Sequence, residues 1–539
     1  MEGMKKKRKD NKERISKKIR KEEQGITLVA LVITIIIIII LATVTINMAF
    51  GDNGLITQAQ KAKDMTANSI AAEQEGMNSV MSEYLNVMAE DSEIPVPNPP
   101  EEPYVDRVLP SAPELSDGMV PVKWNGSNWV RTTADDEEWY DYANKEWANI
   151  VLTPESGANS GKDATGTVDL FDSDGILNED SAYTMLVWIP RYAYQITTNY
   201  HTNAAEGGNI NIVFIDTNNQ NKEKTTTYST SYPNATTGGG MDDYVVHPAF
   251  NYGGTQLPGF WVGKFETSNT NCTTDVTTGQ ASYTGNEVIQ IKAGVTSWRN
   301  IQVSDIFTTC INMNNSGNPY GLNASDTVVD PHMMKNGEWG AVAYLSKNAT
   351  YGKGEEVWIN PNSNFITGQA GSSVSASSTT STDAYNTGNG SQVSTTGNAT
   401  GVYDMSGGAY EYVAAYVNNG HSNLSAYGNS LVNETDTKYK DTYRASATNG
   451  NDNQQTNYNY AQPTETSGHY GDATWETSSN YTGSTSWCGD YSYFPYTSDL
   501  FFLRGGYYSA TSIAGVFNFS CSNGGANSNC TFRLVLPAL

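Results

Sequence analysis

The sequence predicts an α+β protein, in which an N-terminal helical region precedes a longer β-rich region. Three observations point to this class. Residues 26–50 are almost entirely apolar, and residues 55–90 space their apolar side chains as a helix does. The remaining part, about 435 residues, is rich in Tyr, Gly, Asn, Ser and Thr. Only 17% of the chain is charged, a composition that favours short strands joined by long loops.

Residues 1–25 form a basic leader that is expected to stay in the cytoplasm. They hold 11 Lys/Arg and 5 Asp/Glu, so the positive-inside rule places this end on the cytoplasmic side. Residues 26–50 follow without a charge and supply the roughly 20 apolar residues that a membrane-spanning helix needs. We therefore expect a single-pass cell-membrane protein whose bulk is extracellular. A cleaved secretory signal peptide is the alternative, but its apolar region would be shorter.

Residues 51–91 are predicted to form a stalk helix after a turn at Gly51–Gly54. Its apolar residues stand three, four or seven apart: Ile70, Met77, Met81, Tyr84 and Met88. Such a stripe fits packing against the chain's own domain as well as against other subunits. Residues 92–104 are rich in proline, so they are predicted to be a semi-rigid linker at a domain boundary.

Residues 105–165 are predicted to form a small β module, and residues 166–539 the main domain. Within the module, aromatic and β-branched runs alternate with turn residues between Asp117 and Ala148. Four tryptophans lie in this stretch: Trp124, Trp129, Trp139 and Trp147. They fit the core of a small domain better than a carbohydrate-stacking platform.

The charge of the extracellular part excludes some partners. The whole chain has 32 basic and 57 acidic residues, so 21 basic and 52 acidic residues remain after the leader. Such an acidic surface argues against binding to nucleic acid or to anionic lipid.

Cysteine and histidine patterns predict neither a disulfide framework nor a metal centre. Five cysteines are few for this length, although an extracellular location permits disulfides. Cys521 with Cys530 is the first candidate pair. Cys272 with Cys310 is a second candidate pair, and Cys488 would then remain unpaired. The five histidines show no zinc-binding spacing, so no metal and no cofactor are expected.

The N-terminus resembles that of type IV prepilins of the Gram-positive type. Gly25 stands between the charged leader and the apolar run GITLVALVITI, and GDNGLITQAQKAK follows. The resemblance implies that a prepilin peptidase cuts between Gly25 and Ile26, and that pilus subunits are potential partners. The fifth residue after the cut is Ala30, where pilins that assemble usually have Glu, which argues against filament assembly.

Separated segments of the C-terminal half resemble the landmarks of the formylglycine-generating-enzyme, or sulfatase-modifying-factor, family. They are GFWVGKFETS at 259–268, GVYDMSGGAYEYVAAY at 401–416, LRGG at 503–506 and FRLVL at 532–536. The resemblance implies a loop-rich variant of the C-type lectin fold. Trp339–Ser346 fits the helix between the first two landmarks, and 362–400 and 446–486 are Ser/Thr/Gly-rich insertions. Arg533, inside an apolar run, is predicted to be buried and paired.

The family's oxidase activity is not expected here. Its copper chemistry depends on a pair of closely spaced cysteines after RGGS, whereas here Tyr507 follows RGG and the two cysteines stand nine apart. At the family's calcium loop Gly408 replaces Asn, which removes a side-chain ligand. A copper oxidase is kept only as an alternative function.

The segment between LRGG and FRLVL resembles the variable region of retroelement-diversified C-type-lectin-fold proteins. Small or apolar residues alternate there with Tyr, Ser, Asn, Cys and Thr, a composition that any exposed binding loop shares. We expect an adhesin or ligand-display protein, anchored in a membrane or pilus, that binds an extracellular protein or glycan; a structural pilin subunit is the alternative. The predicted ligand contacts are Tyr507, Tyr508, Ser509, Thr511, Ser512, Ile513, Asn518, Ser520, Asn523, Asn527 and Asn529, with Trp487 and Tyr491 as flanking aromatics.

Overall fold

The structure is a computed structural model that describes residues 110–272, 285, 287–315, 317–323, 329–378, 382–447, 453–463 and 469–539. The predicted leader, membrane helix and stalk helix, the linker, and the cleavage site at Gly25 and Ile26 lie outside the described residues. Within the described ranges, no helix combines the length and the apolar character needed to cross a bilayer.

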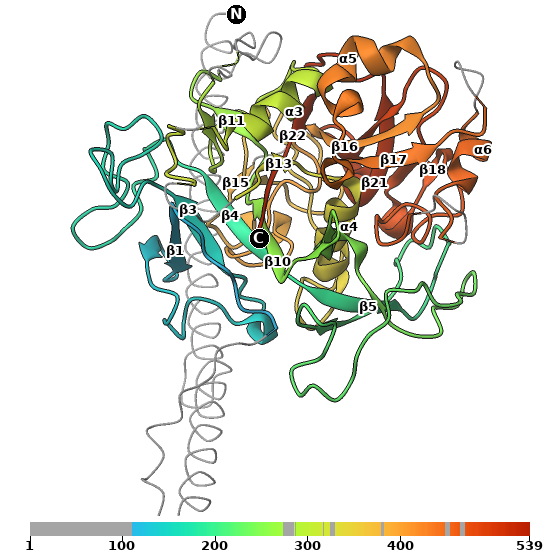
Figure 1. The fold of residues 1–539 in the computed structure, drawn as a ribbon, viewed down its shortest axis with the longest axis horizontal. Helices are drawn as coiled ribbons and strands as arrows, with labels where there is room; N and C mark the ends of the chain where they lie inside the picture. Colours follow the sequence, from blue (N-terminus) through green and yellow to red (C-terminus); the bar gives the residue numbers. More distant parts are fainter. Residues whose placement is uncertain are drawn as a thin grey trace, which may run out of the picture. The chain divides into compact units, whose positions relative to one another are not determined.

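Asp106–Leu539 form one compact unit that contains two larger sheets (Figure 1). The first sheet has seven strands, in the order β13 (His332–Met333), β23 (Leu534–Pro537), β10 (Gly259–Gly263), β4 (Met185–Pro190), β3 (Asn149–Leu152), β1 (Met119–Trp124) and β2 (Trp129–Arg131). The second has the order β17 (Asp441–Arg444), β16 (Tyr410–Asn418), β20 (Phe501–Gly505), β21 (Gly515–Ser522), β19 (Tyr491–Tyr493) and β18 (Thr482–Thr485), and β22 (Cys530–Phe532) also pairs with β16.

Smaller sheets and short helices complete the described part of the unit. The strands are β6 (Ile210–Phe214), β5 (Tyr192–Ile196) and β7 (Val245–Val246) in one sheet, with the pairs β8 (Asn251–Tyr252) and β9 (Thr255–Gln256), β11 (Ser268–Asn269) and β12 (Ile289–Gln290), and β14 (Gln369–Ala370) and β15 (Asp383–Ala384). The α-helices are α3 (Val303–Asn312), α4 (Asn336–Lys347), α5 (Ser422–Asn433) and α6 (Gln454–Asn459). The 3₁₀ turns are η1 (Tyr142–Asn144), η2 (Pro248–Phe250), η3 (Gly390–Val393), η4 (Thr437–Tyr439), η5 (Trp487–Gly489) and η6 (Thr511–Ile513).

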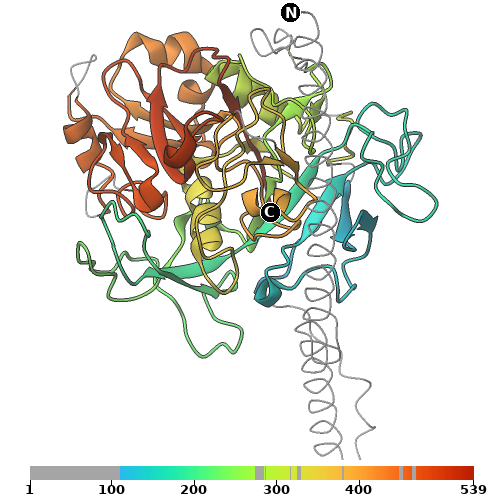
Figure 2. The ribbon, with the colours of Figure 1, turned by 180° about the vertical axis from the view of Figure 1, so that it is seen from behind.

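The centre of the first sheet is buried on both faces, because its strands are continuous apolar runs. Every residue of β4, MLVWIP, and of β10, GFWVG, is buried. Trp188 of β4 lies opposite Trp261 of β10, with ring centroids 5.1 Å apart. The second sheet and α5, in orange and red, lie on the other side of the unit from the blue strands β1 and β3 (Figure 2).

The predicted boundary at residues 165/166 does not separate two compact units. Strand β3 of the expected β module pairs directly with β4, and β1 and β2 continue the sheet beyond β3, so all three belong to the same sheet as the chain's last strand, β23. Trp129, Trp139 and Trp147 are buried in the common core, which confirms the core interpretation for these three. A small module could not bury that much aromatic surface alone, so it shares its core with the main domain.

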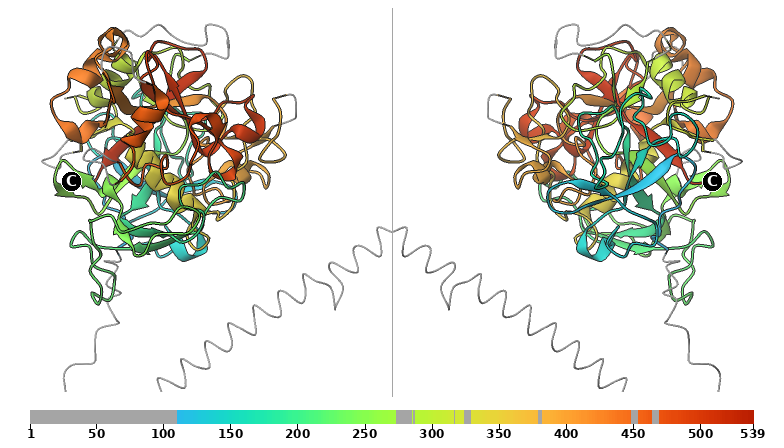
Figure 3. Two further views of the ribbon diagram at one scale, coloured as in Figure 1. Left: turned by 90° about the vertical axis from the view of Figure 1, so that its right-hand side faces the viewer. Right: turned by 90° about the vertical axis from the view of Figure 1, so that its left-hand side faces the viewer.

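Helix α4 connects the second sheet to the β5 sheet. Trp339 Nε1 donates to the Val516 carbonyl of β21 at 2.7 Å, and the Tyr192 hydroxyl of β5 donates to the Ala341 carbonyl at 2.7 Å. The helix contains the predicted run Trp339–Ser346 and is buried over most of its length. The side views in Figure 3 show the green loop between β6 and β7 extending away from this core.

Candidate functional site

Strand β21 positions the predicted binding segment within the second sheet. It lies between β20 and β19, with Phe502 opposite Cys521 and Leu503 opposite Ser520. Phe517 and Phe519 are buried, whereas Ser520 to Ser522 are half-buried. The first half of β21 is therefore core, and its second half reaches the surface.

Three tyrosines line the neighbouring strand β19 and the turn after it. Tyr491 and Tyr493 alternate along the strand, so they point to the same face. Their rings are parallel within 4°, with centroids 6.0 Å apart, and Tyr496 meets Tyr493 edge-on at 5.5 Å. All three side chains are half-buried. Together they present aromatic rings and hydroxyl groups at the surface of a rigid sheet.

A second tyrosine group lies where β20 ends. Tyr507 stacks on Tyr410 of β16 at 5.2 Å, and Tyr508 meets Tyr507 edge-on at 5.5 Å. Gly505 and Gly506 have φ of +82° and +77°, a left-handed backbone that other residues rarely adopt. The Tyr508 N–H donates to the Gly408 carbonyl at 2.8 Å, which fixes the turn.

The two tyrosine groups are close enough to interact electrostatically. Burial raises the pKa of Tyr410 above its usual range, and the hydroxyls of Tyr507 and Tyr491 raise it further. We call the half-buried residues Tyr410, Tyr491, Tyr493, Tyr496, Tyr507 and Tyr508 the tyrosine face.

Most of the predicted contact residues are accessible around this face. Ser509, Ser512, Ile513 and Asn527 are exposed, and Ile513 is one of three exposed large apolar residues in the described part of the chain. The half-buried ones are Tyr507, Tyr508, Thr511, Ser520, Asn523, Asn529 and Tyr491.

Three residues of the tyrosine face, Tyr410, Tyr493 and Tyr496, were not among the predicted contacts. The alternation in YSYFPY signals Tyr493, but strand pairing alone brings Tyr410 to the same face.

Two predicted contacts are corrected, because Trp487 and Asn518 are fully buried. The Trp487 Nε1 donates to the Asn199 carbonyl at 2.9 Å, and its ring meets Phe517 edge-on at 5.3 Å. Asn518 Nδ2 donates to the Ile513 carbonyl at 2.7 Å. Asn518 holds the loop before β21 from inside, Trp487 packs against the start of β21, and neither side chain faces a ligand.

Asp490 fixes the start of β21 against η5. Its Oδ2 accepts the Phe517 N–H at 2.9 Å, and its carboxylate lies so close to Gly515 that a Cβ at that position would meet both oxygens. Ser486 Oγ donates to the Phe517 carbonyl at 2.9 Å. Burial raises the pKa of Asp490 well above its usual range, so this carboxyl group favours its protonated form.

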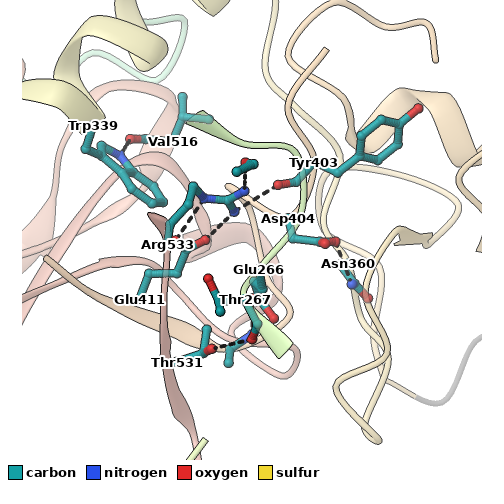
Figure 4. Close-up of polar contacts among 12 residues, drawn as sticks. Glu266, Thr267, Trp339, Asn360, Tyr403, Asp404, Glu411, Val516, Thr531 and Arg533 are labelled. Atoms are coloured by element: carbon teal, nitrogen blue, oxygen red, sulfur yellow. Dashed lines mark hydrogen bonds and ion pairs between the residues drawn. The ribbon is translucent and has the colours of Figure 1, made fainter. Parts of the chain in front are cut away.

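Beneath the face, Arg533 joins the two larger sheets (Figure 4). Its Nε and Nη2 donate to the two carboxylate oxygens of Glu411, at 3.0 and 2.5 Å, and its Nη1 donates to the Gly263 carbonyl of β10 at 2.7 Å. Neither charged side chain is exposed. The prediction of a buried, paired arginine is confirmed.

Two further buried carboxyl groups surround this ion pair. Glu266 Oε1 accepts the Ala409 N–H at 2.7 Å, and Asp404 Oδ1 accepts from Asn360 Nδ2 at 2.9 Å. Burial raises the pKa of Glu266 well above its usual range, with the charges of Asp404 and Glu411 adding to the effect. Burial also raises the pKa of Asp404, to about 6. One arginine faces three carboxyl groups, so protonation of some of them relieves the imbalance.

The described residues do not gather ligands for a metal ion. No group of three or more His, Cys, Asp or Glu side chains is arranged to hold one in the described ranges. At the loop that resembles the family's calcium loop, the Gly408 Cα faces the Glu266 carboxylate so closely that a Cβ would collide with it. An asparagine ligand does not fit there.

The predicted Cys521–Cys530 disulfide is not formed, because both residues are free thiols. Cys521 lies on β21 and Cys530 on β22, and strands β20 and β16 lie between them in the sheet. Three strand spacings amount to about 14 Å, whereas a disulfide requires Cα atoms within about 7 Å. Burial raises the pKa of the Cys530 thiol to about 12 and raises that of Cys521 as well. A reactive cysteine has the opposite shift.

Comparison with known proteins finds a weak likeness among solved structures. No family model matches the chain, and no curated protein matches it. Among solved structures, Treponema denticola variable protein 1 is similar at 12% identity and a TM-score of 0.23, over 66% of this chain and 96% of that one. A likeness this weak assigns no role to any residue of this chain.

Proposed function

We propose that this protein displays the tyrosine face on the outside of a cell, where the face binds an extracellular protein or glycan. The observation that carries the proposal is the set of half-buried tyrosine rings on β16, on β19 and after β20 of one sheet, bordered by exposed Ser and Asn side chains. Tyrosine supplies a large contact area at a small cost in conformational entropy, and Ser and Asn supply adaptable hydrogen bonds.

The rigidity of the support favours binding over a purely structural role. The tyrosines stand on strands of the second sheet or next to them, and the loop that carries Tyr507 and Tyr508 is held where it enters β21 by the buried side chains of Asp490 and Asn518. A preorganised surface loses little entropy when it binds. In this proposal the chain is not an enzyme, and a single N-terminal membrane helix tethers it.

The experiment is a binding screen of the full chain in detergent against arrays of extracellular proteins and of glycans. The double variant Tyr491→Ala/Tyr493→Ala is expected to weaken the best interaction at least about tenfold. The matched control is Tyr228→Ala/Tyr244→Ala, which removes another half-buried tyrosine pair, 5.6 Å apart, elsewhere on the unit. Equal losses in both double variants, or no binding on either array, would overturn the proposal.

The tether has its own test. N-terminal sequencing of the chain purified from its native membrane is expected to begin at Ile26, because the predicted peptidase cuts after Gly25. A Gly25→Leu variant is expected to keep the leader. A native N-terminus at Met1, or one beyond residue 50, would refute the prepilin interpretation but not the binding function of the tyrosine face.

A further inference from the structure

A separate polar cavity of about 360 Å³ lies at the N-terminus of α4. Its walls come from the segment around η2 and the β8–β9 turn, from η4, from the start of β17 and from residues 469–472. None of the residues of the tyrosine face lines it. Its volume lies in the range of roughly 300–1,000 Å³ that is usual for small-molecule sites.

Lys335 brings an incompletely neutralised ammonium to this cavity. The residue is 6% exposed, and its Nζ forms one ion pair within the described part of the chain, with Glu338 Oε1 at 3.4 Å. Glu338 is already shared, because its Oε1 lies 2.9 Å from His332 Nε2 and its Oε2 accepts the Lys335 N–H at 2.8 Å. A nearly buried ammonium with one long, shared contact is a favourable position for a ligand anion.

Asp441 brings the opposite charge to the same cavity. Its Oδ2 accepts the Gly337 N–H at 2.8 Å, and it forms no ion pair with any residue that the structure describes. Burial raises the pKa of this carboxyl group, while the charges of Lys335 and His469 act in the other direction. Lys335 and Asp441 therefore face one cavity with opposite charges and do not pair with each other.

The other lysine of the cavity is already neutralised. Lys438 Nζ lies 2.7 Å from Asp330 Oδ2 and 3.5 Å from Asp436 Oδ2. It stands over the Tyr252 ring at 5.2 Å, as Lys335 does. Lys438 thus belongs to the wall, and Lys335 is the ammonium left to bind a ligand.

The wall around Gly471 is held by buried hydrogen bonds. The Gly471 N–H donates to Glu476 Oε2 at 2.7 Å, and the Gly471 carbonyl lies 2.8 Å from His247 Nε2. Glu476 in turn accepts hydrogen bonds from three tyrosine hydroxyls, those of Tyr194, Tyr232 and Tyr344. The cavity is therefore preformed, and a ligand does not have to order it.

We propose that this cavity binds a free α-amino acid, whose carboxylate pairs with Lys335 and whose ammonium pairs with Asp441. A ligand that carries both charges neutralises both groups, whereas a ligand with a single charge satisfies one and leaves the other. The proposal stands apart from the tyrosine face, and either can fail without the other.

Isothermal titration calorimetry of the full chain against each of the 20 standard L-amino acids tests the proposal. At least one amino acid is expected to bind. Its N-acetyl derivative, which lacks the ammonium, and its amide, which lacks the carboxylate, are each expected to bind at least about tenfold more weakly, because each loses one charge-assisted contact. These ligand variants need no change in the protein, so a folding defect cannot imitate the result.

Two substitutions then assign the groups. Lys335→Met is expected to remove the preference for a free carboxylate, and Asp441→Asn the preference for a free ammonium. Lys162→Met and Asp169→Asn are the matched controls, because they break an ion pair whose charged atoms are 2.6 Å apart and whose residues do not line the cavity. Both control variants are expected to leave the two preferences intact. Absence of binding by all 20 amino acids, or equal binding of an amino acid and its two blocked derivatives, would overturn the proposal.

Discussion

Arg533 and Glu411 form a doubly hydrogen-bonded ion pair, with distances of 3.0 and 2.5 Å, in which neither side chain is exposed. Glu411 lies on β16 of the second sheet, and Arg533 lies between β22 and β23, the last strand, which pairs with β10 of the first sheet. The ion pair therefore connects the second sheet, which carries the tyrosine face, to the first sheet.

Removing one member of this pair is expected to destabilise the unit strongly. Arg533→Met leaves the Glu411 carboxylate buried without its cation, which costs about 3–5 kcal/mol of unfolding free energy. Urea unfolding followed by tryptophan fluorescence measures the change. The surface pair of Lys162 and Asp169 is the control, and Lys162→Met is expected to cost less than about 1 kcal/mol. Equal effects of the two substitutions would contradict this account.

The buried carboxyl groups predict a specific pH dependence. The pKa of Asp404 rises from 3.8 to about 6 on folding because of burial. Between these values the folded state binds more protons than the unfolded state, so this group lowers the unfolding free energy as pH rises from about 4 to 6. Asp404→Asn is expected to remove a slope of at most about 1.4 kcal/mol per pH unit. Urea unfolding of the unsubstituted protein and of the Asp404→Asn variant across this pH range measures the slope. Identical slopes in the two proteins would refute the assignment of this pH dependence to Asp404.

The carboxyl group of Glu476 is expected to be required for stability. The hydroxyls of Tyr194 and Tyr232 each donate to its Oε1 at 2.7 Å, and that of Tyr344 to its Oε2 at 2.5 Å. In Glu476→Gln an amide NH₂ replaces one acceptor oxygen, so buried donors lose their partner at a cost of about 1–3 kcal/mol. Thermal unfolding measures this cost. Glu155→Gln, at an exposed position, should leave the melting temperature unchanged.

Free thiols are expected at both C-terminal cysteines. The unfolded, unreduced protein should react with a thiol reagent at Cys521 and Cys530, since two strands of the sheet keep them apart in the folded state. Peptide mass spectrometry after alkylation without reduction checks this. A peptide that joins the two residues would show that the order of strands is wrong here.

Diversification of the binding segment is expected to leave a pattern in the gene. Deep sequencing of the 3′ end in a clonal culture and in close relatives should show substitutions confined to adenine-derived codons between Tyr507 and Thr531. The substitutions should fall on the accessible positions and spare Asn518, because its side chain is buried. A uniform sequence would leave a binding surface of fixed specificity.

Several features could be predicted from the chain because they depend on local pattern. The helical run Trp339–Ser346 lies inside α4, and the apolar context of Arg533 predicts its burial and pairing. The alternation of tyrosines in YSYFPY marks one face of a strand wherever that strand lies.

Other features depend on contacts between distant parts of the chain. Asn518 is a polar residue in the binding segment, yet it is buried beside Ile513, and the Lys335–Asp441 cavity joins residues about a hundred positions apart. The sequence by itself determined the β-rich class, the apolar cores of the strands and the composition of the binding segment, because side-chain size, polarity and periodicity act locally. Only the tertiary structure decided which side chains reach the surface, which cysteines stay apart and which charges share a cavity, because strand order and helix docking bring those groups together.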